Sequence, residues 1–400
     1  MLKKASPAQE AAAEKRYLQR LEAARNSTHV NPFESESDQA ARIERAKKDY
    51  NFFCRTYFPI ICEHDCPPFH IENAHRIKAN KHCRELMAMG SGMAKSMNYT
   101  TLVPLWIMLQ GELKTMLVCS INSDKAIELL DPIRAELEGN ALLIHDFGKQ
   151  KKEGAWEAKH FQTQNGCGFF ALGIGQSPRG VRQHQSRVDY LVFDDCDDKA
   201  VCRNPKRLAQ HTNWCLEDAL GTTSPRGSRV IFVNNIFAEQ TILTTIRDTR
   251  NDAGAWHYTQ VNATDENGKA TWDYPGAQEY YDSLRAAMGP LSFASEYNNT
   301  PYAKGTVFTD ELIQWAELPP LDKFEAIVGH WDVAFTDTKT ADFNAVQVWG
   351  LYQKNYYMID CFTKKSQLRE VIRWIFLKKI ETENQARILF FLKASFGIKA

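Results

Sequence analysis

The stretch Leu86–Ser96 combines the residue types that proteins use to hold a phosphate group. It reads LMAMGSGMAKS, an apolar strand that runs into a glycine-containing turn, a lysine and a hydroxyl. Small residues let backbone N–H groups face an anion, and the helix that follows adds its positive N-terminal end. We therefore expect Lys95 to reach the β- and γ-phosphates of a nucleotide and the Ser96 hydroxyl to bind Mg²⁺.

The motif departs from the usual G-x-x-x-x-G-K-[ST] pattern at both glycine positions. Met89 stands in place of the first glycine, and Ala94 stands in place of the second. A turn of this kind also arises by chance, and this alternative stays open for the stretch alone. The predicted phosphate loop comprises Gly90, Ser91, Gly92, Met93, Ala94, Lys95 and Ser96.

A second stretch, Arg187–Asp195, supplies two carboxylates at the end of an apolar strand and reads RVDYLVFDD. In a P-loop ATPase, the first such acid holds Mg²⁺ and the next orients or deprotonates the attacking water. Asp194 and Asp195 occupy these two places. A strand that ends in Asp-Asp is by itself more often the start of a polar loop. Two such strands in this order favour a nucleotide site.

Composition limits the class of protein. The 400 residues suffice for two domains, and the hydrophobic (44%) and charged (24%) fractions are those of a globular protein. Because the formal net charge is zero, nucleic acid would have to contact a local basic patch. The ten cysteines form no repeating framework, which predicts reduced thiols in a cytoplasmic protein. No apolar run reaches the ~20 residues that span a bilayer, so we expect no membrane segment.

The group Cys62, His64, Cys66 and His70 raises the question of a zinc site. Its C-x-H-x-C spacing differs from the two-residue spacer of a zinc knuckle, and a second knuckle is missing. The sequence therefore favours small buried residues over metal ligands here.

The chain divides into four stretches by composition and periodicity. Residues 1–49 predict a charged N-terminal helical or disordered arm. In residues 50–262, continuous apolar runs alternate with helical stretches, which is typical of βαβ units and a parallel sheet covered on both faces. Residues 263–320 are polar and rich in turns, and predict a linker or bridge. Residues 321–400 predict strands, a hairpin, an amphipathic helix and a last strand.

Asp332 lies near the end of the first apolar strand of residues 321–400. An RNase H-like nuclease begins with the same order of strand, Asp, polar turn, antiparallel strands, helix and strand. Cleavage with two Mg²⁺ or Mn²⁺ ions needs several carboxylates, so Asp332 alone cannot support it. A plain turn-capping role for Asp332 stays open.

The ordered series of motifs resembles the large terminase subunit of tailed bacteriophages and prophages, the motor that packages DNA into proheads. The likeness extends over most of residues 53–400. In the first half of the chain, it rests on the aromatic-Phe-Pro stretch Tyr57–Pro59, the Phe-His pair Phe69–His70 and the irregular phosphate loop Gly90–Ser96. It continues with Ser177–Gly180 ahead of the Asp-Asp strand and with Asn234–Asn235 at the end of a later strand. The last parts are the bridge Gly289–Pro301 and the nuclease opening Trp331–Asp342.

The resemblance implies roles for single residues. Lys95 and Ser96 would bind phosphate and Mg²⁺, and Asp194 would be the Walker B acid. Asp195 falls where the family often has its catalytic glutamate, with a shorter reach. Asn235 would couple ATP hydrolysis to movement.

An arginine commonly precedes the glycine of the phosphate loop in this family, and Ser91 occupies that place here. An arginine finger that stabilises charge on the γ-phosphate must then come from elsewhere. Arg179 and Arg182 are the candidates, acting in cis or in trans, and ordinary surface arginines are the alternative.

The nuclease half departs further from the family. Asp332 matches the first acid, whereas the second usually lies on a later strand in a pattern like apolar-Glu-Ala-x-Phe. The matching stretch here is FLKASF, with Lys393 in place of the carboxylate. No third acid appears before Ala400. We expect poor binding of nuclease metals and interpret this half as truncated or inactivated.

The fold expected is therefore α/β: a P-loop ATPase of RecA/ASCE type with a mostly parallel sheet, then an incomplete RNase H-like α/β nuclease domain. The resemblance implies ATP and Mg²⁺ as cofactors, with Mg²⁺ or Mn²⁺ in any nuclease site. It implies double-stranded DNA, a portal protein and a small terminase subunit as partners, and a homo-oligomeric ring on the portal. It places the chain in the cytoplasm of the infected bacterial host and outside the mature virion.

Two other functions stay open. A superfamily 2-like helicase or translocase would need a second RecA-like domain, and the region after Asn299 lacks a second set of buried parallel strands. A degenerate prophage remnant would keep the fold and neither activity, and Lys393 favours this for the nuclease half.

Overall fold

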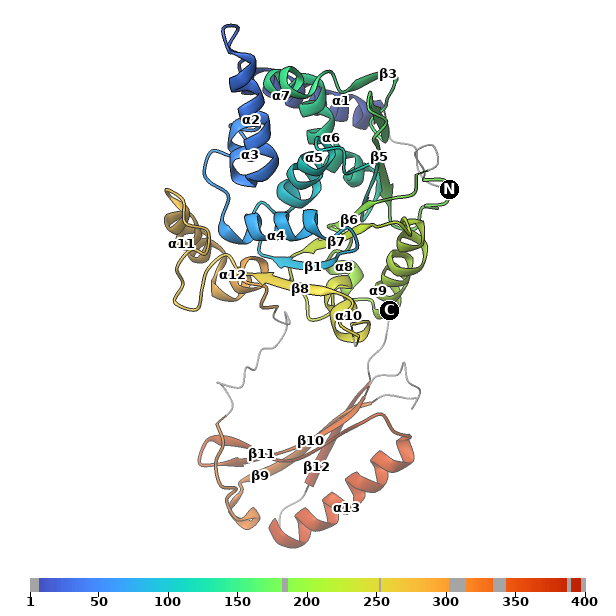
Figure 1. Ribbon diagram of the computed structural model, residues 1–400. Coiled ribbons are helices and arrows are strands. Elements are labelled where there is room, and N and C mark those ends of the chain that lie inside the picture. Colours follow the sequence, from blue (N-terminus) through green and yellow to red (C-terminus); the bar gives the residue numbers. More distant parts are fainter. Residues whose placement is uncertain are drawn as a thin grey trace. The chain divides into compact units, whose positions relative to one another are not determined.

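Figure 1 shows the computed structural model of the chain, which describes residues 7–181, 186–251, 253–301, 314–333, 343–386 and 390–396. The chain forms two compact units, Met1–Gly305 and Thr306–Ala400. Residues 263–301, expected to form part of a linker or bridge, belong to the first unit. None of the described helices is long and apolar enough to span a membrane.

The first unit is built on an eight-stranded sheet of order β3-β4-β5-β2-β6-β7-β1-β8. The six strands from β5 to β8 in this order are parallel, and β3 and β4 extend one edge as antiparallel strands. The prediction of a mostly parallel α/β sheet is therefore confirmed, whereas the β3–β4 hairpin was not predicted. The strands are β1 Arg84–Met89, β2 Thr115–Ser120, β3 Lys151–Trp156, β4 His160–Thr163, β5 Gly168–Gly173, β6 Tyr190–Asp194, β7 Arg229–Asn234 and β8 His257–Val261.

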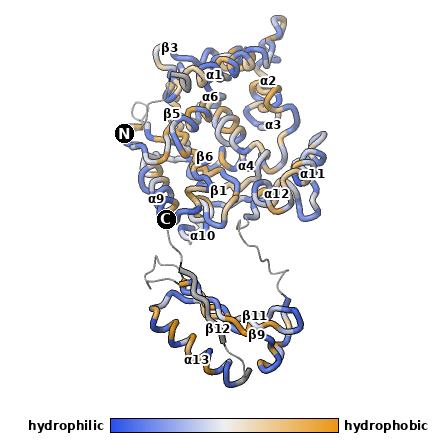
Figure 2. Tube along the Cα trace, turned by 180° about the vertical axis from the view of Figure 1, so that it is seen from behind, coloured by the Kyte–Doolittle hydropathy of each residue, from blue (hydrophilic) through white to orange (hydrophobic). Residues whose placement is uncertain are grey.

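Helices cover both faces of this sheet (Figure 1), which explains why its central strands have continuous apolar stretches between polar end residues. Every residue of β2, β6 and β7 is buried. One apolar core contains residues of α2–α7, α11 and α12, and the other contains residues of α8–α10. Figure 2 shows the apolar strands in the middle of this unit. The helices are α1 Pro7–Ser27, α2 Glu36–Lys48, α3 Tyr50–Tyr57, α4 Pro68–Ala79, the π-helix η1 Met97–Leu102, α5 Val103–Met108, α6 Ser123–Gly139, α7 Ala141–Phe147, α8 Lys199–Cys202, α9 Pro205–Asn213, the π-helix η2 Trp214–Ala219, the short 3-10 helix η3 Leu220–Thr222, α10 Ile242–Thr249, α11 Ala277–Met288 and α12 Pro290–Tyr297.

The charged N-terminal stretch forms α1 and α2 in the described residues, and polar contacts bind both to the rest of the unit. The Tyr17 hydroxyl on α1 donates a 2.6 Å hydrogen bond to the Glu138 carboxylate on α6. Arg42 on α2 pairs with Asp146 at 2.7 Å and with Glu34. These charges therefore face partners of opposite charge within the unit.

The second unit is a four-stranded sheet of order β11-β10-β9-β12 with one helix, α13. Strand β10 is antiparallel to both of its neighbours, β9 and β11, and β12 runs parallel to β9 on the other side of that strand. Val371 and Ile375 of α13 pack with Val346 of β10 in the core of this unit. The elements are β9 Ala326–Val333, β10 Asn344–Tyr352, β11 Asn355–Lys364, α13 Leu368–Ala386 and β12 Phe390–Phe396.

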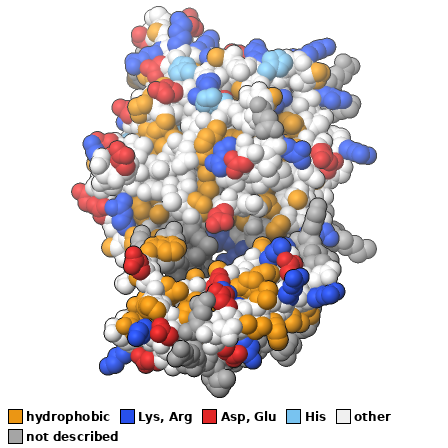
Figure 3. All heavy atoms as spheres, turned by 90° about the horizontal axis from the view of Figure 1, so that it is seen from below, with side chains coloured by type: hydrophobic (Ala, Val, Ile, Leu, Met, Phe, Trp, Pro, Cys, Tyr) orange, Lys and Arg blue, Asp and Glu red, His pale blue; other side chains and the backbone are white. Residues whose placement is uncertain are grey.

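Charges of both signs are mixed on the face of the molecule drawn in Figure 3. Lysine and arginine side chains stand there beside acidic ones, with hydrophobic patches between them.

Candidate functional site

The residues predicted to bind a nucleotide meet at the carboxyl edge of the eight-stranded sheet. The phosphate loop, Gly90–Ser96, follows β1, and Asp194 is the last residue of β6. Strand β7 lies between β1 and β6, and all three are parallel. Since the carboxyl ends of parallel strands share one edge, two segments far apart in the sequence come together there.

A hydrogen bond joins the two predicted motifs. The Ser96 hydroxyl donates to Asp194 Oδ1 at 2.9 Å, and the Thr100 hydroxyl donates to Asp194 Oδ2 at 2.7 Å. Thr100 lies one helical turn after Ser96, so both hydroxyls point from the same side of η1. The sequence analysis missed Thr100, although its i+4 spacing from Ser96 was a usable signal.

The Asp194 carboxylate is held in an environment that disfavours its charge. Its side chain is 0% exposed. Burial, and then the neighbouring Asp195 charge, raise its pKa to about 6, while the bonds from Thr100 and Ser96 and the charge of Lys95 act in the opposite direction. A bound divalent cation would favour the ionised form, so this carboxylate fits a metal ligand better than a lone buried acid.

Lys95 and Asp195 carry side chains that are available for a ligand. Among the described residues, the Lys95 ammonium and the Asp195 carboxylate have no hydrogen-bond or ion-pair partner, although the charges of both act on the neighbouring Asp194 carboxylate. The Asp195 backbone is fixed, because its carbonyl accepts bonds from the Ile121 N–H at 3.1 Å and the Ser120 hydroxyl at 3.2 Å. Asp195 has a φ of 48°, a left-handed conformation that is strained for a residue with a side chain.

The backbone of the phosphate loop explains its irregular sequence. Ala94 has a φ of 52°, so it adopts the conformation that favours glycine in the place where the motif expects one. A Cβ atom on Gly90 would lie 1.9 Å from the carbonyl oxygen of Tyr297. Only glycine fits there. The loop therefore keeps the backbone conformation of the motif. Its first glycine is shifted by one residue to Gly90, and Ala94 replaces the second.

Helix α12 packs directly on this loop. The Ser91 N–H donates to the Glu296 carbonyl at 3.0 Å. The Asn235 side-chain amide donates to the Glu296 carboxylate at 3.2 Å and to its carbonyl at 3.3 Å. Glu296 therefore contacts both the phosphate loop and the residue predicted to couple hydrolysis to movement.

A buried acid that the sequence analysis missed lies beside the same strand end. Asp197 accepts hydrogen bonds from the Asn234 amide at 2.5 Å and from the Ile242 N–H at 2.6 Å. Burial raises the pKa of Asp197 to about 6. Its two partners give it a structural role that links the end of β7 to the start of α10.

His70 supports the phosphate loop from helix α4. Its Nε2 lies 2.8 Å from the Met93 carbonyl and its Nδ1 lies 2.9 Å from the Tyr99 hydroxyl. Burial lowers the pKa of His70 to about 4, so the ring is neutral. Since a carbonyl only accepts, Nε2 carries the proton, and the Tyr99 hydroxyl, which accepts from Asn73 at 2.8 Å, donates to Nδ1.

The remaining predicted residues lie apart from this group. Arg179 is exposed after β5 and lines a surface pocket with Glu217 and Asp218. Arg182 lies outside the described residues. Asp332 is an exposed residue of β9 in the second unit, and its register partner on β12 is Ser395.

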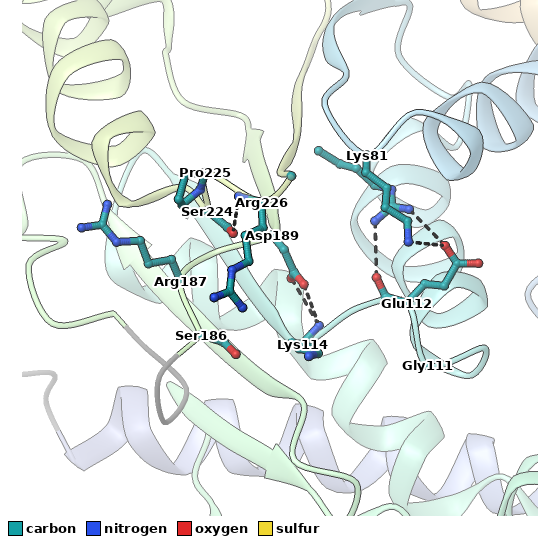
Figure 4. Close-up of a pocket in the computed structure, with 12 residues that line it drawn as sticks. Lys81, Gly111, Glu112, Lys114, Ser186, Arg187, Asp189, Ser224, Pro225 and Arg226 are labelled. Atoms are coloured by element: carbon teal, nitrogen blue, oxygen red, sulfur yellow. Dashed lines mark hydrogen bonds and ion pairs between the residues drawn. The ribbon is translucent and has the colours of Figure 1, made fainter.

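A cavity of about 650 Å³ opens at the opposite edge of the sheet (Figure 4). Its lining residues lie just before strands β1, β2, β6 and β7 or, for Arg229, at the start of β7, and none of them is a predicted site residue. Two of its charged residues have structural partners: the half-buried Asp189 carboxylate accepts from the Lys114 and Thr115 N–H groups, and the buried Arg229 guanidinium donates to two carbonyls of α4. The carboxyl edge is therefore the stronger candidate site.

No protein-family model matches the chain, and no curated protein matches it. The structure is similar to phage large terminases and to a DNA packaging motor. The large terminase from a thermophilic bacteriophage is 10% identical, with 80% of this chain and 78% of that chain covered and a TM-score of 0.35. The Thermus phage P74-26 large terminase ATPase domain is 14% identical, with 56% and 91% covered and a TM-score of 0.38. The Phi-28 gp11 DNA packaging motor is 12% identical, with 79% and 92% covered and a TM-score of 0.31.

Proposed function

We propose that the first unit binds ATP with Mg²⁺ at the carboxyl edge of its sheet and hydrolyses it. The observation that carries this proposal is the 2.9 Å hydrogen bond from the Ser96 hydroxyl to the buried Asp194 carboxylate. It joins the last residue of the phosphate loop to the acid at the end of β6. The strand order supports an ATPase of the ASCE class, because β7 is inserted between β1 and β6.

The residues at this edge fit a magnesium nucleotide. A hydroxyl and a carboxylate are the hard oxygen ligands that Mg²⁺ prefers, and Ser96 and Asp194 would supply them. When bound, Mg²⁺ neutralises negative charge that develops on the transferring phosphoryl group. Lys95, which has no partner among the described residues, would neutralise further charge on the β- and γ-phosphates.

Asp195 would orient the attacking water and accept its proton. Its carboxylate is unengaged among the described residues, while its carbonyl is fixed by Ile121 and Ser120. A fixed backbone with an unengaged side chain suits a residue that must point at a substrate. Asp195 is one methylene shorter than the glutamate that the family often has at this place, so its carboxylate extends less far from the backbone.

We further propose that hydrolysis drives translocation of double-stranded DNA, as in the packaging motor that the ordered motifs resemble. Asn235 contacts Glu296, and the Glu296 carbonyl accepts from Ser91 in the phosphate loop. A nucleotide that repositions the loop would therefore act on α12 and on the end of β7 together. The portal protein, the small terminase subunit, a ring of subunits and an arginine finger from Arg179 or Arg182 belong to this proposal.

We propose that the second unit has an RNase H-like nuclease fold and that Lys393 impairs its metal site. Its strand order, with three antiparallel strands and β12 parallel to β9, matches the predicted series of elements. Asp332 lies on the first of these strands, and Lys393 lies on the last. The sequence pattern of the family predicts that Lys393 stands in place of the second acid. We propose that this unit does not cleave DNA.

The helicase alternative is less well supported, because the described part of the second unit has a mixed four-stranded sheet and not a second buried parallel one. The remnant alternative is opposed in the first unit by the intact group of Lys95, Ser96, Asp194 and Asp195.

The proposal is tested by measuring ATP hydrolysis with and without linear double-stranded DNA. The unmodified chain should hydrolyse ATP faster with DNA, and Lys95→Ala should abolish both rates. Lys206→Ala, an exposed lysine on α9, is the matched control and should leave both rates unchanged. Unwinding of a forked duplex would favour a helicase, and no hydrolysis even with DNA would contradict the proposal.

A further inference from the structure

Three cysteine side chains meet beside helix α3, away from the phosphate loop. The Sγ atoms of Cys54, Cys62 and Cys66 all lie within 4.8 Å of one another. Cys54 is buried on α3, and the other two are partly buried in the loop between α3 and α4. The sequence analysis considered Cys62 and Cys66 and missed Cys54, because a helical residue outside the C-x-H-x-C stretch gives no spacing signal.

The loop that carries two of these cysteines is fastened to the helix that carries the third. Asn51, Cys54 and Arg55 share one face of α3, since they are three and four residues apart. The Asn51 side-chain carbonyl accepts from the Cys66 N–H at 2.8 Å, and the Arg55 guanidinium donates to the Cys62 carbonyl. The backbone at both loop cysteines is therefore fixed around the sulfur atoms, as in a site with ordered supporting contacts.

We propose that Cys54, Cys62 and Cys66 bind one Zn²⁺ ion through their thiolates, with water in the fourth position. Tetrahedral Zn²⁺ with Zn–S bonds of about 2.3 Å places its sulfur ligands about 3.8 Å apart, a spacing that a cluster confined to 4.8 Å accommodates. Thiolates are soft ligands that select Zn²⁺ over Mg²⁺. Binding releases to solvent the proton of each thiol that was protonated.

Nearby histidines do not complete the site as it stands. Both ring nitrogens of His70 are hydrogen bonded, to the Met93 carbonyl and the Tyr99 hydroxyl. The His64 ring is stacked on Tyr274 with 5.2 Å between centroids and is not within the 4.8 Å group. Since Cys62 and Cys66 are partly exposed, water can reach the fourth position.

The ion would join α3 to the start of α4, which begins at Pro68 immediately after this loop. Helix α4 carries His70, whose contact with Met93 supports the phosphate loop. Loss of the ion should therefore lower the melting temperature of the first unit. This inference does not depend on the proposed ATPase activity.

The first test measures the metal content of the full chain by inductively coupled plasma mass spectrometry. The chain is purified under reducing conditions with Zn²⁺ supplied. The expected result is one Zn²⁺ per chain, lost in Cys62→Ser and in Cys66→Ser. Cys361→Ser, an exposed cysteine of the second unit, is the matched control and should retain the ion.

A second measurement keeps the test valid if the cysteine variants fail to fold. Co²⁺ added to the metal-stripped unmodified chain should give the thiolate-to-cobalt charge-transfer band and the intense visible bands of a tetrahedral site, and Zn²⁺ should remove them. No bound metal, zinc retained in full by both loop variants, or a disulfide between two of the three cysteines by intact mass would each overturn the proposal.

Discussion

Asp194 and Asp332 both lie at or near the end of an apolar strand, yet the two units place them in opposite environments. Asp194 is 0% exposed and accepts bonds from two hydroxyls. Asp332 is exposed on β9, and its register partners are Ala345 and Ser395, neither of which is ionisable. A buried carboxylate costs folding free energy, which suggests a ligand for it, whereas an exposed one costs little and needs none. The same sequence pattern therefore carries different weight in the two units.

The largest expected effect is the difference in ATP hydrolysis between the variants of the two acids. Asp194→Asn should lower the kcat of ATP hydrolysis at least about a hundredfold, because it removes a charged Mg²⁺ ligand. Asp332→Asn should leave kcat unchanged, since the residue belongs to the second unit. Steady-state hydrolysis by both variants checks this. An equal loss of kcat in both variants would contradict the different roles of Asp194 and Asp332.

Gly90→Ala should cost about 3 kcal/mol of unfolding free energy, because the new Cβ would clash with the Tyr297 carbonyl of α12. Gly221→Ala, where an added Cβ meets nothing within 4 Å and φ is not positive, is the matched control. Urea unfolding measures both. Similar urea midpoints for Gly90→Ala and Gly221→Ala would show that α12 does not pack on the phosphate loop as described.

Asp194 should also make the stability of the first unit depend on pH. The folded pKa of Asp194, about 6, is above the ordinary 3.8, so ionisation destabilises the metal-free fold above pH 6 and the cost disappears as pH falls toward 3.8. Asp194→Asn should therefore stabilise the chain by up to about 3 kcal/mol at pH 8 and by much less at pH 4.

Urea midpoints of Asp194→Asn at several pH values, with EDTA present, measure this difference. Asp332→Asn is the exposed control and should shift no midpoint. A destabilised Asp194→Asn at pH 8 would contradict the account of a costly buried charge.

Ala94→Gly should raise stability by about 1 kcal/mol or less and preserve hydrolysis, because it relieves a left-handed alanine at φ 52°. Ala135→Gly, inside helix α6, should act in the opposite direction. Thermal melts of the two variants check the sign. Loss of stability in Ala94→Gly would show that the loop is not strained there.

The smallest expected effect concerns the second unit. Lys393→Glu would restore an acid on β12, next to the strand of Asp332, and should raise Mn²⁺ affinity a few-fold over the weak binding of the unmodified chain. Calorimetric titration with Mn²⁺ compares the two. Strong Mn²⁺ binding by the unmodified chain would mean that this unit is not impaired.

Local patterns predicted much of the first unit. Strands β1, β2, β6 and β7 could be predicted because each is a continuous apolar run within a short segment. The meeting of Lys95, Ser96 and Asp194 could be predicted because the ends of parallel strands share one sheet edge. The contacts of Glu296 with the phosphate loop join residues that are far apart in the sequence, and no periodicity reports them. The same holds for Cys54, whose partners lie beyond the end of its helix.

The most direct test of the central claim is calorimetric binding of a non-hydrolysable ATP analogue to the unmodified chain, with Mg²⁺ or with EDTA. We predict binding that weakens without Mg²⁺, that is lost in Lys95→Ala, and that no longer responds to Mg²⁺ in Asp194→Asn. Asp332→Asn should bind like the unmodified chain. Nucleotide binding that is indifferent to Mg²⁺ and unchanged in both Lys95→Ala and Asp194→Asn would contradict the account.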